Sequence, residues 1–266
     1  MSHFNCLVIS RKGRSVESLL APYDEELECA PRVYKTKSQI ISEALAELVE
    51  AKMGTNENIR KSFYKDIQEF FNNSDDVQSY TDEQLYRYGI RFEDEDHIND
   101  QGDIISYSNP QGYWDWYTYD KSSSRWTSDL ILKDGTRTNR AFVKDIDWEA
   151  MNTPTPEDLQ YYKRFWRVAT RKEEAKKGEN LRIWKTPEYY LSTYKNEDNF
   201  IRCMTQYAAY AVIDAHGMWH AQGEMGWWGV SLEKENATID WHNGFMAMIL
   251  KMVRPDDEII IVDCHI

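Results

Sequence analysis

Two apolar runs of strand length lie near the two ends of the chain, and they constrain its fold more than any other feature. The first, His3 to Ile9, runs into the turn-forming stretch Ser10-Arg-Lys-Gly13. The second, Glu258 to His265, is apolar enough to be a central strand of a sheet. We predict that both are strands of one sheet. If they are antiparallel neighbours, the sheet brings the first and last histidines together.

Helix and strand signals alternate between these runs. Capping residues, in two cases followed by proline, indicate helix starts at Thr36, Thr81, Thr155 and Thr186. Shorter β signals lie at 104–107, 113–133 and 207–222, and a final helix precedes Arg254-Pro255. The pattern predicts an α+β fold with a mixed or antiparallel sheet that includes the N- and C-terminal strands, flanked by several amphipathic helices. We expect a single domain over residues 1–266, with 150–156 as the candidate subdivision.

Composition narrows the class of protein further. The 266 residues include 10 Trp and 17 Tyr, and each buried aromatic side chain removes about 150–250 Å² from water, so aromatics should dominate the core. There is no long apolar run and no signal sequence, so we expect a cytoplasmic protein without membrane contact. The four cysteines lack metal-knuckle spacing and are expected to be reduced thiols.

Charge is unevenly distributed along the chain. The net charge of −13 opposes general attraction to nucleic acid or anionic lipid. Residues 66–103 carry twelve acids and two arginines, whereas residues 161–185 carry nine bases and three acids. The acidic segment either imitates a phosphate backbone or forms a solvated surface. The basic segment interleaves arginines with aromatic side chains, a pattern typical of single-strand binding but also of an ordinary solvated helix face.

The stretch from Gly112 to Trp126 contains six aromatic side chains in fifteen residues. In an extended strand Trp114 and Trp116 share one face, which we expect to be the core, while Asp115 and Tyr117 share the wetter face. We further expect Arg125 to return on a paired strand and to meet Asp115 or Asp120. As an alternative, the motif forms a binding surface together with a second tryptophan pair, its residues being Trp114, Asp115, Trp116, Tyr117, Arg125, Trp126, Trp227 and Trp228.

Histidines and carboxylates near the two ends suggest chemistry. Side chains alternate along a strand, so Asp263 and His265 share one face, where an antiparallel neighbour would also present His3. Two imidazoles and a carboxylate could bind a divalent metal that activates water. The alternative is that these residues form structural carboxylate–imidazole pairs.

Glu224 is a further catalytic candidate. It lies between Gly223 and Met225 and precedes Trp227 and Trp228, a setting in which partial burial could make it a general acid or base. The alternative is a loop glutamate that accepts backbone N–H bonds. His216 and His220 are four residues apart, but this spacing falls across a predicted turn and does not favour a metal site.

Several blocks of the sequence resemble a family of uncharacterised proteins encoded by phages and prophage-like elements. The blocks are Met1-Ser-His-Phe4 with Leu7-Val-Ile9, Leu20-Ala-Pro-Tyr23, Asn109-Pro110 with Trp114-Asp-Trp-Tyr117 and Arg125-Trp126, Gly223-Glu-Met-Gly-Trp-Trp-Gly229, and Val262-Asp-Cys-His-Ile266. The resemblance implies a phage-related genomic setting but no activity. The family's central block has two glycines before its Arg-Trp, where this chain has Ser123 and Ser124.

Three functions remain open from the sequence. The first is a phage-encoded accessory protein, not an enzyme, that binds and modulates a host or phage protein, plausibly as a counter-defence inhibitor; nucleic acid is not the expected partner and no cofactor is needed. The alternative is a metal-dependent hydrolase acting on a nucleotide or nucleic acid through His3, Asp263, His265 and Glu224. The third is a small-molecule or nucleotide sensor whose pocket is lined by Trp114, Trp116, Trp227 and Trp228. No GxSxG, Walker-type or Rossmann motif supports the common enzyme classes.

Overall fold

The chain divides into two compact units, one inserted into the other. A computed structural model describes residues 3–52, 80–225, 231–232 and 236–266. Unit 1 comprises residues 1–27 and 109–266, and unit 2 comprises residues 28–108. The division therefore falls at 27/28 and 108/109 rather than near 150–156, where the prolines suggested a subdivision. The reason is that Thr153-Pro-Thr-Pro156 serves as a helix entry within unit 1.

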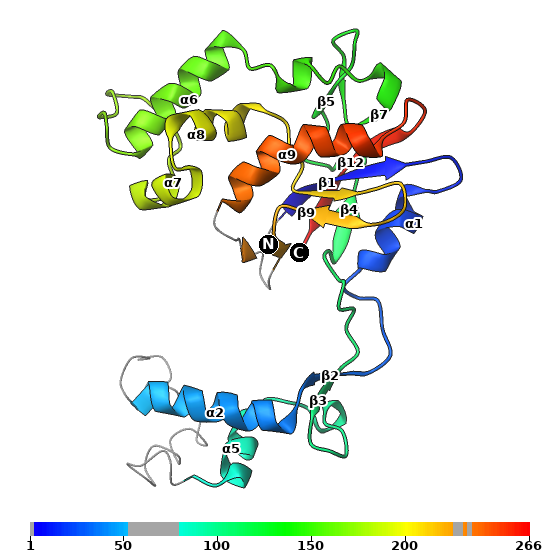
Figure 1. Ribbon diagram of the computed structural model, residues 1–266, viewed down its shortest axis with the longest axis vertical. Helices are drawn as coiled ribbons and strands as arrows, with labels where there is room; N and C mark the ends of the chain where they lie inside the picture. Colours follow the sequence, from blue (N-terminus) through cyan, green and yellow to red (C-terminus); the bar gives the residue numbers. More distant parts are fainter. Residues whose placement is uncertain (1–2, 53–79, 226–230, 233–235) are drawn as a thin grey trace. The chain divides into compact units, whose positions relative to one another are not determined.

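Unit 1 is built on a mixed sheet in the order β4-β12-β1-β8-β9 (Figure 1). Its strands are β1 (His3–Ser10), β4 (Trp116–Thr118), β8 (Ala211–Ile213), β9 (Trp219–Ala221) and β12 (Glu258–His265), with β7 (Arg140–Phe142) also pairing with β12. β1 pairs antiparallel with β12 along its full length and parallel with β8. The α+β class and the sheet that includes both terminal strands are thus confirmed.

The two central strands are apolar on both faces, as their sequences predict. On one face, Phe4, Cys6, Val262 and Cys264 pack with the short helix α1 (Val16–Leu20). On the other face, the apolar side chains of β1 and β12 pack against Phe245 and Ile249 of α9 (Ala237–Met252). Figure 1 shows α9 running across the sheet. Burial of both faces accounts for the near-continuous apolar runs of the two strands.

Three helices of unit 1 form a group that lies between β7 and β8 in the sequence. α6 (Pro156–Ala169) begins with a capping box between Thr155 and Asp158, as predicted from the sequence. α7 (Pro187–Tyr194) and α8 (Glu197–Thr205) complete the group. Phe200 lies at its centre, with its ring 5.2 Å from that of Trp166. This group therefore has an aromatic core of its own, separate from the two faces of the sheet.

Two helix ends differ from the sequence prediction. α6 ends at Ala169 and not at Gly178, because Arg171 adopts a left-handed backbone conformation with φ 57° that stops the helix. The single helix expected from Thr186 towards Cys203 is two helices. Lys195, with φ 65°, ends α7, and the side chain of Asn196 caps α8. Local conformations of non-glycine residues, which periodicity does not reveal, set both boundaries.

Short elements connect the larger ones in unit 1. Two small ladders are formed by β5 (Leu130–Ile131) with β6 (Arg137–Thr138), and by β10 (Glu224–Met225) with β11 (Ser231–Leu232). Single 3₁₀ turns occur at Ala21–Tyr23, Val143–Asp145 and Ala150–Asn152. The region 113–133, expected to be β structure throughout, is β only at β4 and β5, with turns between them.

Unit 2 contains two helices and one two-stranded ladder in its described part. α2 (Lys37–Lys52) follows a capping box between Thr36 and Gln39, and α5 (Asp82–Gly89) follows one between Thr81 and Gln84. β2 (Arg32–Lys35) pairs with β3 (Ile104–Ser106), and a 3₁₀ turn lies at Glu95–His97. The helix expected over 59–71 and residues 66–79 of the acidic segment 66–103 lie outside the described residues.

Candidate functional site

The histidines near the two ends of the chain come together, as the sequence predicts. His3 lies opposite His265 across the antiparallel β1–β12 ladder, and their ring centroids are 5.0 Å apart. His3 Nδ1 is 2.7 Å from Oδ1 of Asp263, whose side chain is fully buried. Asp263 Oδ2 accepts a 2.9 Å hydrogen bond from the backbone N–H of Arg125. Both carboxylate oxygens of Asp263 are therefore occupied.

Asp115 joins this group from the bend before β4. Its Oδ1 is 2.5 Å from His265 Nδ1, and its backbone N–H donates to the carbonyl oxygen of His265 at 3.1 Å. The four residues His3, Asp115, Asp263 and His265 are called the terminal cluster below. Sequence reasoning placed Asp115 in a binding motif but missed its pairing with His265, because the bend that aims it there has no distinct sequence signal.

The terminal cluster orients two imidazoles in the same way. Each ring uses Nδ1 on a carboxylate, an arrangement that leaves Nε2 as the nitrogen available for proton exchange. Nε2 of His265 is buried and has no hydrogen-bond partner. Within the described residues, no three His, Cys, Asp or Glu side chains are arranged to hold a metal ion. The described geometry thus forms two carboxylate–imidazole pairs, the alternative arrangement expected for His3, Asp263 and His265.

A second polar row lies next to the terminal cluster on the same face of the sheet. Asn5 lies opposite Asp263, donates from Nδ2 to Asp129 Oδ2 at 3.3 Å, and accepts the backbone N–H of Tyr210. Burial raises the pKa of the Asp129 carboxyl, and it raises the pKa of the Tyr207 hydroxyl well above its usual value. This end of an otherwise apolar face therefore carries several groups whose charged forms are disfavoured.

The aromatic motif does not alternate as predicted. Trp114 is 6% exposed and its Nε1–H donates to the carbonyl oxygen of Leu20, whereas Trp116 is 47% exposed. Tyr117, expected on the wet face, packs against the same core cluster as Trp114. The prediction was wrong because the chain bends at Asp115 and β4 begins only at Trp116, so the two tryptophans do not belong to one strand. Trp114 and Trp116 therefore lie in different surroundings, one buried and one exposed.

Arg125 and Trp126 also differ from the expectation. Arg125 contacts the terminal cluster through its backbone N–H, and its side chain is exposed; it pairs with neither Asp115 nor Asp120 in the described structure. Trp126 packs against the core cluster beneath α9. Ser123 and Ser124 donate their backbone N–H groups to Asp120 O, forming the turn before Arg125. The turn is closed here with serines.

The other sequence candidates lie either outside the described residues or apart from the terminal cluster. Glu224 lies in β10, but its side chain is outside the described part, as are Trp227 and Trp228 entirely. His216 and His220 lie on the turn and strand around Asp214, where His220 Nε2 is 3.3 Å from Asp214 Oδ2. The expected strand and turn at 207–222 are confirmed by β8 and β9.

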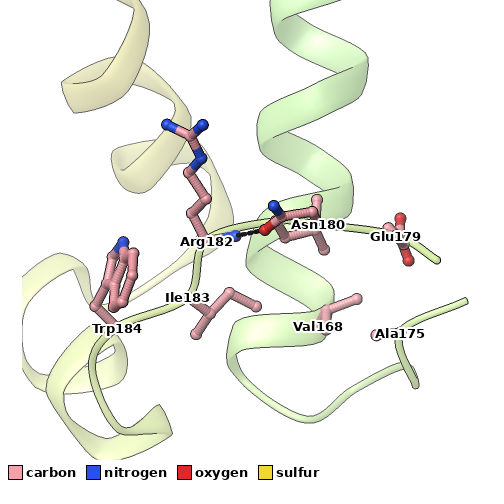
Figure 2. A pocket seen from close by; sticks show the side chains of 8 residues that line it. Val168, Ala175, Glu179, Asn180, Arg182, Ile183 and Trp184 are labelled. Carbon is pink, nitrogen blue, oxygen red and sulfur yellow. Dashed lines mark hydrogen bonds between the residues drawn. The ribbon is translucent and has the colours of Figure 1, made fainter. Parts of the chain in front are cut away.

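A second candidate site lies in the helical group of unit 1, on the segment between α6 and α7. Trp184 is 83% exposed and borders an open cavity of about 600 Å³ (Figure 2). The other lining residues are Val168, Ala175, Glu179, Asn180, Leu181, Arg182 and Ile183. Figure 2 shows these side chains arranged around the segment as it passes the end of α6. Tryptophan is enriched among the residues that dominate binding energy at interfaces.

Electrostatic pairs hold this segment against α6. Arg164 donates from Nε and Nη2 to the two carboxylate oxygens of Glu179 at 2.8 and 2.7 Å. This bidentate bond lowers the pKa of Glu179 to about 2. Glu173 also pairs with Arg164 and Arg167. Glu173 and Glu179 of the segment are thus matched by cations of α6, whereas Lys163, Lys176, Lys177 and Arg182 form no ion pair within the described residues.

Sequence reasoning noted the basic and aromatic residues here but not the site. Trp184 was counted only among the aromatic side chains interleaved with bases over residues 161–185, and it lies on an irregular segment beyond the end of α6. The available signal was the run of nine bases and three acids together with a tryptophan just before the Thr186-Pro187 helix start.

Comparison with protein-family models, with curated proteins and with solved structures finds no match for this chain. Among the described residues, no helix combines the length and the apolar character needed to span a bilayer. The geometry of this chain alone therefore identifies its two candidate sites.

Proposed function

We propose that this protein acts by binding and modulating another protein, and that it does so through the surface around Trp184. The Trp184 surface is defined as the cavity-lining residues given above together with the exposed cations beside them, Lys163, Lys176, Lys177 and Arg182. The observation that carries the proposal is the 83% exposure of Trp184 at the edge of that cavity.

Energetics support a contact role for this side chain. Burying a large aromatic side chain stabilises a complex by about 1.5–3 kcal/mol, and tryptophan is enriched among residues that dominate binding energy. Trp166, on the same helical group, is fully buried, so the group's own core does not lack aromatic surface. Trp184 is therefore not needed to complete that core.

The nature of the partner follows from the resemblance of this chain to phage-encoded proteins. An accessory protein of a phage meets host proteins in the infected cell, and a host protein is accordingly the proposed target. Inhibition of a defence component is one way in which such binding would benefit the phage.

Two tryptophan variants test the proposal in one experiment. Tagged wild-type protein, Trp184→Ala and Trp116→Ala are used to capture proteins from a host lysate. Trp116 is the matched control because it is also exposed, at 47%, but belongs to β4. The expected result is one stoichiometric protein retained by the wild type and by Trp116→Ala, with retention by Trp184→Ala reduced at least about tenfold. Equal retention by both variants, or no retained protein, would contradict the proposal.

Hydrolysis of a nucleotide or nucleic acid by acid–base catalysis at the terminal cluster is the second candidate. The specific observation in its favour is the pair of imidazoles, each oriented by its own carboxylate, with a buried and unpartnered Nε2 on His265. One oriented histidine could accept a proton from water while the other protonates a leaving group. A need for stability does not by itself explain a buried carboxylate–imidazole pair, since apolar residues of similar volume often stabilise a fold equally well.

A comparison of histidine variants tests this candidate. Chelator-treated protein is assayed against nucleotides and oligonucleotides, with His216→Gln as the control because His216 is an exposed histidine on a turn. The expected result is turnover that His3→Gln and His265→Gln each reduce at least about a hundredfold. Absence of turnover, or equal rates in all variants, would eliminate it.

A further inference from the structure

We infer that the partner segment bound at the Trp184 surface is an acidic stretch of polypeptide that inserts one apolar side chain into the cavity. This inference rests on the proposed function and adds the chemistry of the partner to it. It combines three features of the surface: the aliphatic walls of the cavity, the cations around it, and the fixed backbone at Arg182.

The cavity favours an apolar side chain. Val168, Leu181 and Ile183 contribute aliphatic walls and Trp184 an aromatic one. Glu179 is the one carboxylate among the lining residues, and both of its oxygens accept from Arg164. The cavity, of about 600 Å³, is open, so both water and a ligand can enter it. Its walls give an entering aliphatic or aromatic side chain apolar contacts on several sides.

The rim of the cavity favours negative charge. A second open cavity, of about 650 Å³, shares Glu179, Asn180 and Leu181 with the first and is lined by Lys163 and Lys176. The two hollows therefore flank the same segment. In the described part of the chain, the exposed side chains of four cations on this surface take part in no ion pair: Lys163, Lys176, Lys177 and Arg182.

This positive surface contrasts with the rest of the protein. Residues 161–185 have nine bases against three acids, a local charge of +6, in a chain of net charge −13. Complementary charge on a partner steers its approach and fixes its register on the surface. An acidic segment would thus be attracted to this surface and repelled by the remaining surface of the molecule.

The shape of the surface favours a polypeptide over single-stranded nucleic acid. Nucleic-acid grooves present successive aromatic platforms on which bases stack. Here Trp184 is the one aromatic residue lining the first cavity, and aliphatic side chains form most of the remaining wall. A flat base gains little from such a wall, whereas a leucine or phenylalanine side chain fills it. The net charge of −13 also opposes a long polyanion more than a short acidic segment.

The backbone beside the cavity is held in an uncommon conformation. Arg182 has φ 50°, in the left-handed region, which is unfavourable for a non-glycine residue. Its backbone N–H donates to Oδ1 of Asn180 at 3.3 Å (Figure 2). Such local strain is often found at binding sites. The hydrogen bond to Asn180 constrains the backbone next to Ile183 and Trp184, which reduces the backbone ordering that binding requires.

Fluorescence anisotropy with synthetic peptides tests the inference. The probe is a labelled peptide in which glutamates flank a central leucine, compared with one peptide carrying glutamine for every glutamate and one carrying serine for leucine. The expected result is binding at least about tenfold tighter for the probe than for either comparison peptide, weakening as salt rises from about 50 to 200 mM.

Variants locate the binding. Arg182→Glu and Trp184→Ala are each expected to weaken binding of the probe at least about tenfold. Lys121→Glu is the matched control, because Lys121 is an exposed cation on the turn before Arg125, and it should have no more than a twofold effect, roughly the scatter expected for a peripheral charge.

Other outcomes overturn the inference. Equal effects of Arg182→Glu and Lys121→Glu would assign the binding to general electrostatics, and tighter binding of labelled oligothymidylate than of the peptide would assign the surface to nucleic acid. If lysate capture depends on Trp184 but the acidic probe does not bind, the partner chemistry is wrong and the proposed function stands. If capture also fails, the proposed function itself is wrong.

Discussion

His3 and His265 lie directly opposite each other on adjacent antiparallel strands, and each bonds through Nδ1 to a different carboxylate. The two carboxylates come from different elements, Asp263 from β12 itself and Asp115 from the bend before β4. The terminal cluster thus fastens three separate parts of the chain at one end of the sheet.

A double-mutant cycle measures the strength of that fastening. His3→Ala, Asp263→Ala and the double variant are compared by urea unfolding. We expect a coupling energy of about 0.5–3 kcal/mol, because the pair is in direct contact and Asp263 is fully buried. Additive effects of the two single variants would mean that the 2.7 Å bond contributes nothing to stability.

The two tryptophans around Asp115 should respond differently to truncation. Trp114→Ala is expected to cost about 3–5 kcal/mol in the free energy of unfolding, because the indole is buried and bonded to Leu20. Trp116→Ala should cost less than about 1.5 kcal/mol, since its indole is 47% exposed. Urea unfolding of both variants tests the contrast. Equal losses of unfolding free energy would support the predicted arrangement in which both tryptophans lie on the core face of one strand.

The bond between Arg11 and Asp257 should make the free energy of unfolding depend on pH in the acid range. Arg11 donates to both carboxylate oxygens at 2.9 and 2.8 Å, and this bond lowers the pKa of Asp257 below its usual value. The resulting stabilisation is present above the unfolded pKa of about 3.9 and is lost as pH falls through the lower folded pKa. Asp257→Asn should therefore cost about 1.5–3 kcal/mol at neutral pH and progressively less under acid conditions.

Asp256→Asn is the control for that experiment. Asp256 is the neighbouring acid and pairs with Lys144, but its side chain is 88% exposed. Its replacement should change the free energy of unfolding by about 0–1 kcal/mol at any pH. A loss for Asp256→Asn equal to that for Asp257→Asn would show that the Arg11 bond is not the source of the effect.

Replacement by alanine should change the stability of the protein in opposite directions at two glycines. A Cβ at Gly112 would lie 2.6 Å from the Cα of Glu25, so the backbone must shift and we expect a loss of about 1–3 kcal/mol. Gly244, in the interior of α9, has no atom within 4 Å of such a Cβ. Gly244→Ala should therefore stabilise the protein by about 0.5–1 kcal/mol. Thermal unfolding of the two variants checks both signs.

Asp129 should destabilise the protein when it is ionised. Burial raises its pKa in the folded state, so its contribution to stability is greatest below the unfolded pKa of about 3.9 and declines as pH rises through the folded value. Asp129→Asn cannot ionise. The free energy of unfolding of the variant, relative to that of wild type, should be higher at pH 7 than at about pH 4. Urea unfolding at both pH values measures this difference, and the opposite trend would contradict the direction of the pKa shift.

Much of the sheet could be predicted from the sequence because burial leaves a simple signal. The strands β1 and β12 are covered on both faces, which requires continuous apolar runs, and four threonine-based helix starts carry capping chemistry that is local by nature. The convergence of His3, Asp263 and His265 then follows from strand alternation once the pairing is assumed.

The remainder depended on features without a local signal. Trp116 became exposed because of one bend at Asp115, and α6 ended nine residues before Gly178 because Arg171 took a left-handed conformation. The insertion of unit 2 between residues 27 and 109 is marked in the sequence by Pro31 and by the turn Asn109-Pro-Gln-Gly112, signals that suit an ordinary loop equally well. The cavity beside Trp184 arises from the packing of an irregular segment on α6, which composition alone does not describe.

The pairing of β1 with β12 has a consequence for how the protein is made. His3 and Asp263 are separated by 260 positions in the sequence. At typical synthesis rates of about 5–20 residues per second, the ribosome needs roughly 13–52 s to cover that distance. During this interval β1 has none of its β12 partners, and its apolar side chains are available to chaperones or to other nascent chains. Fast synthesis, or prompt chaperone capture of the first segment, should therefore raise the yield of folded protein.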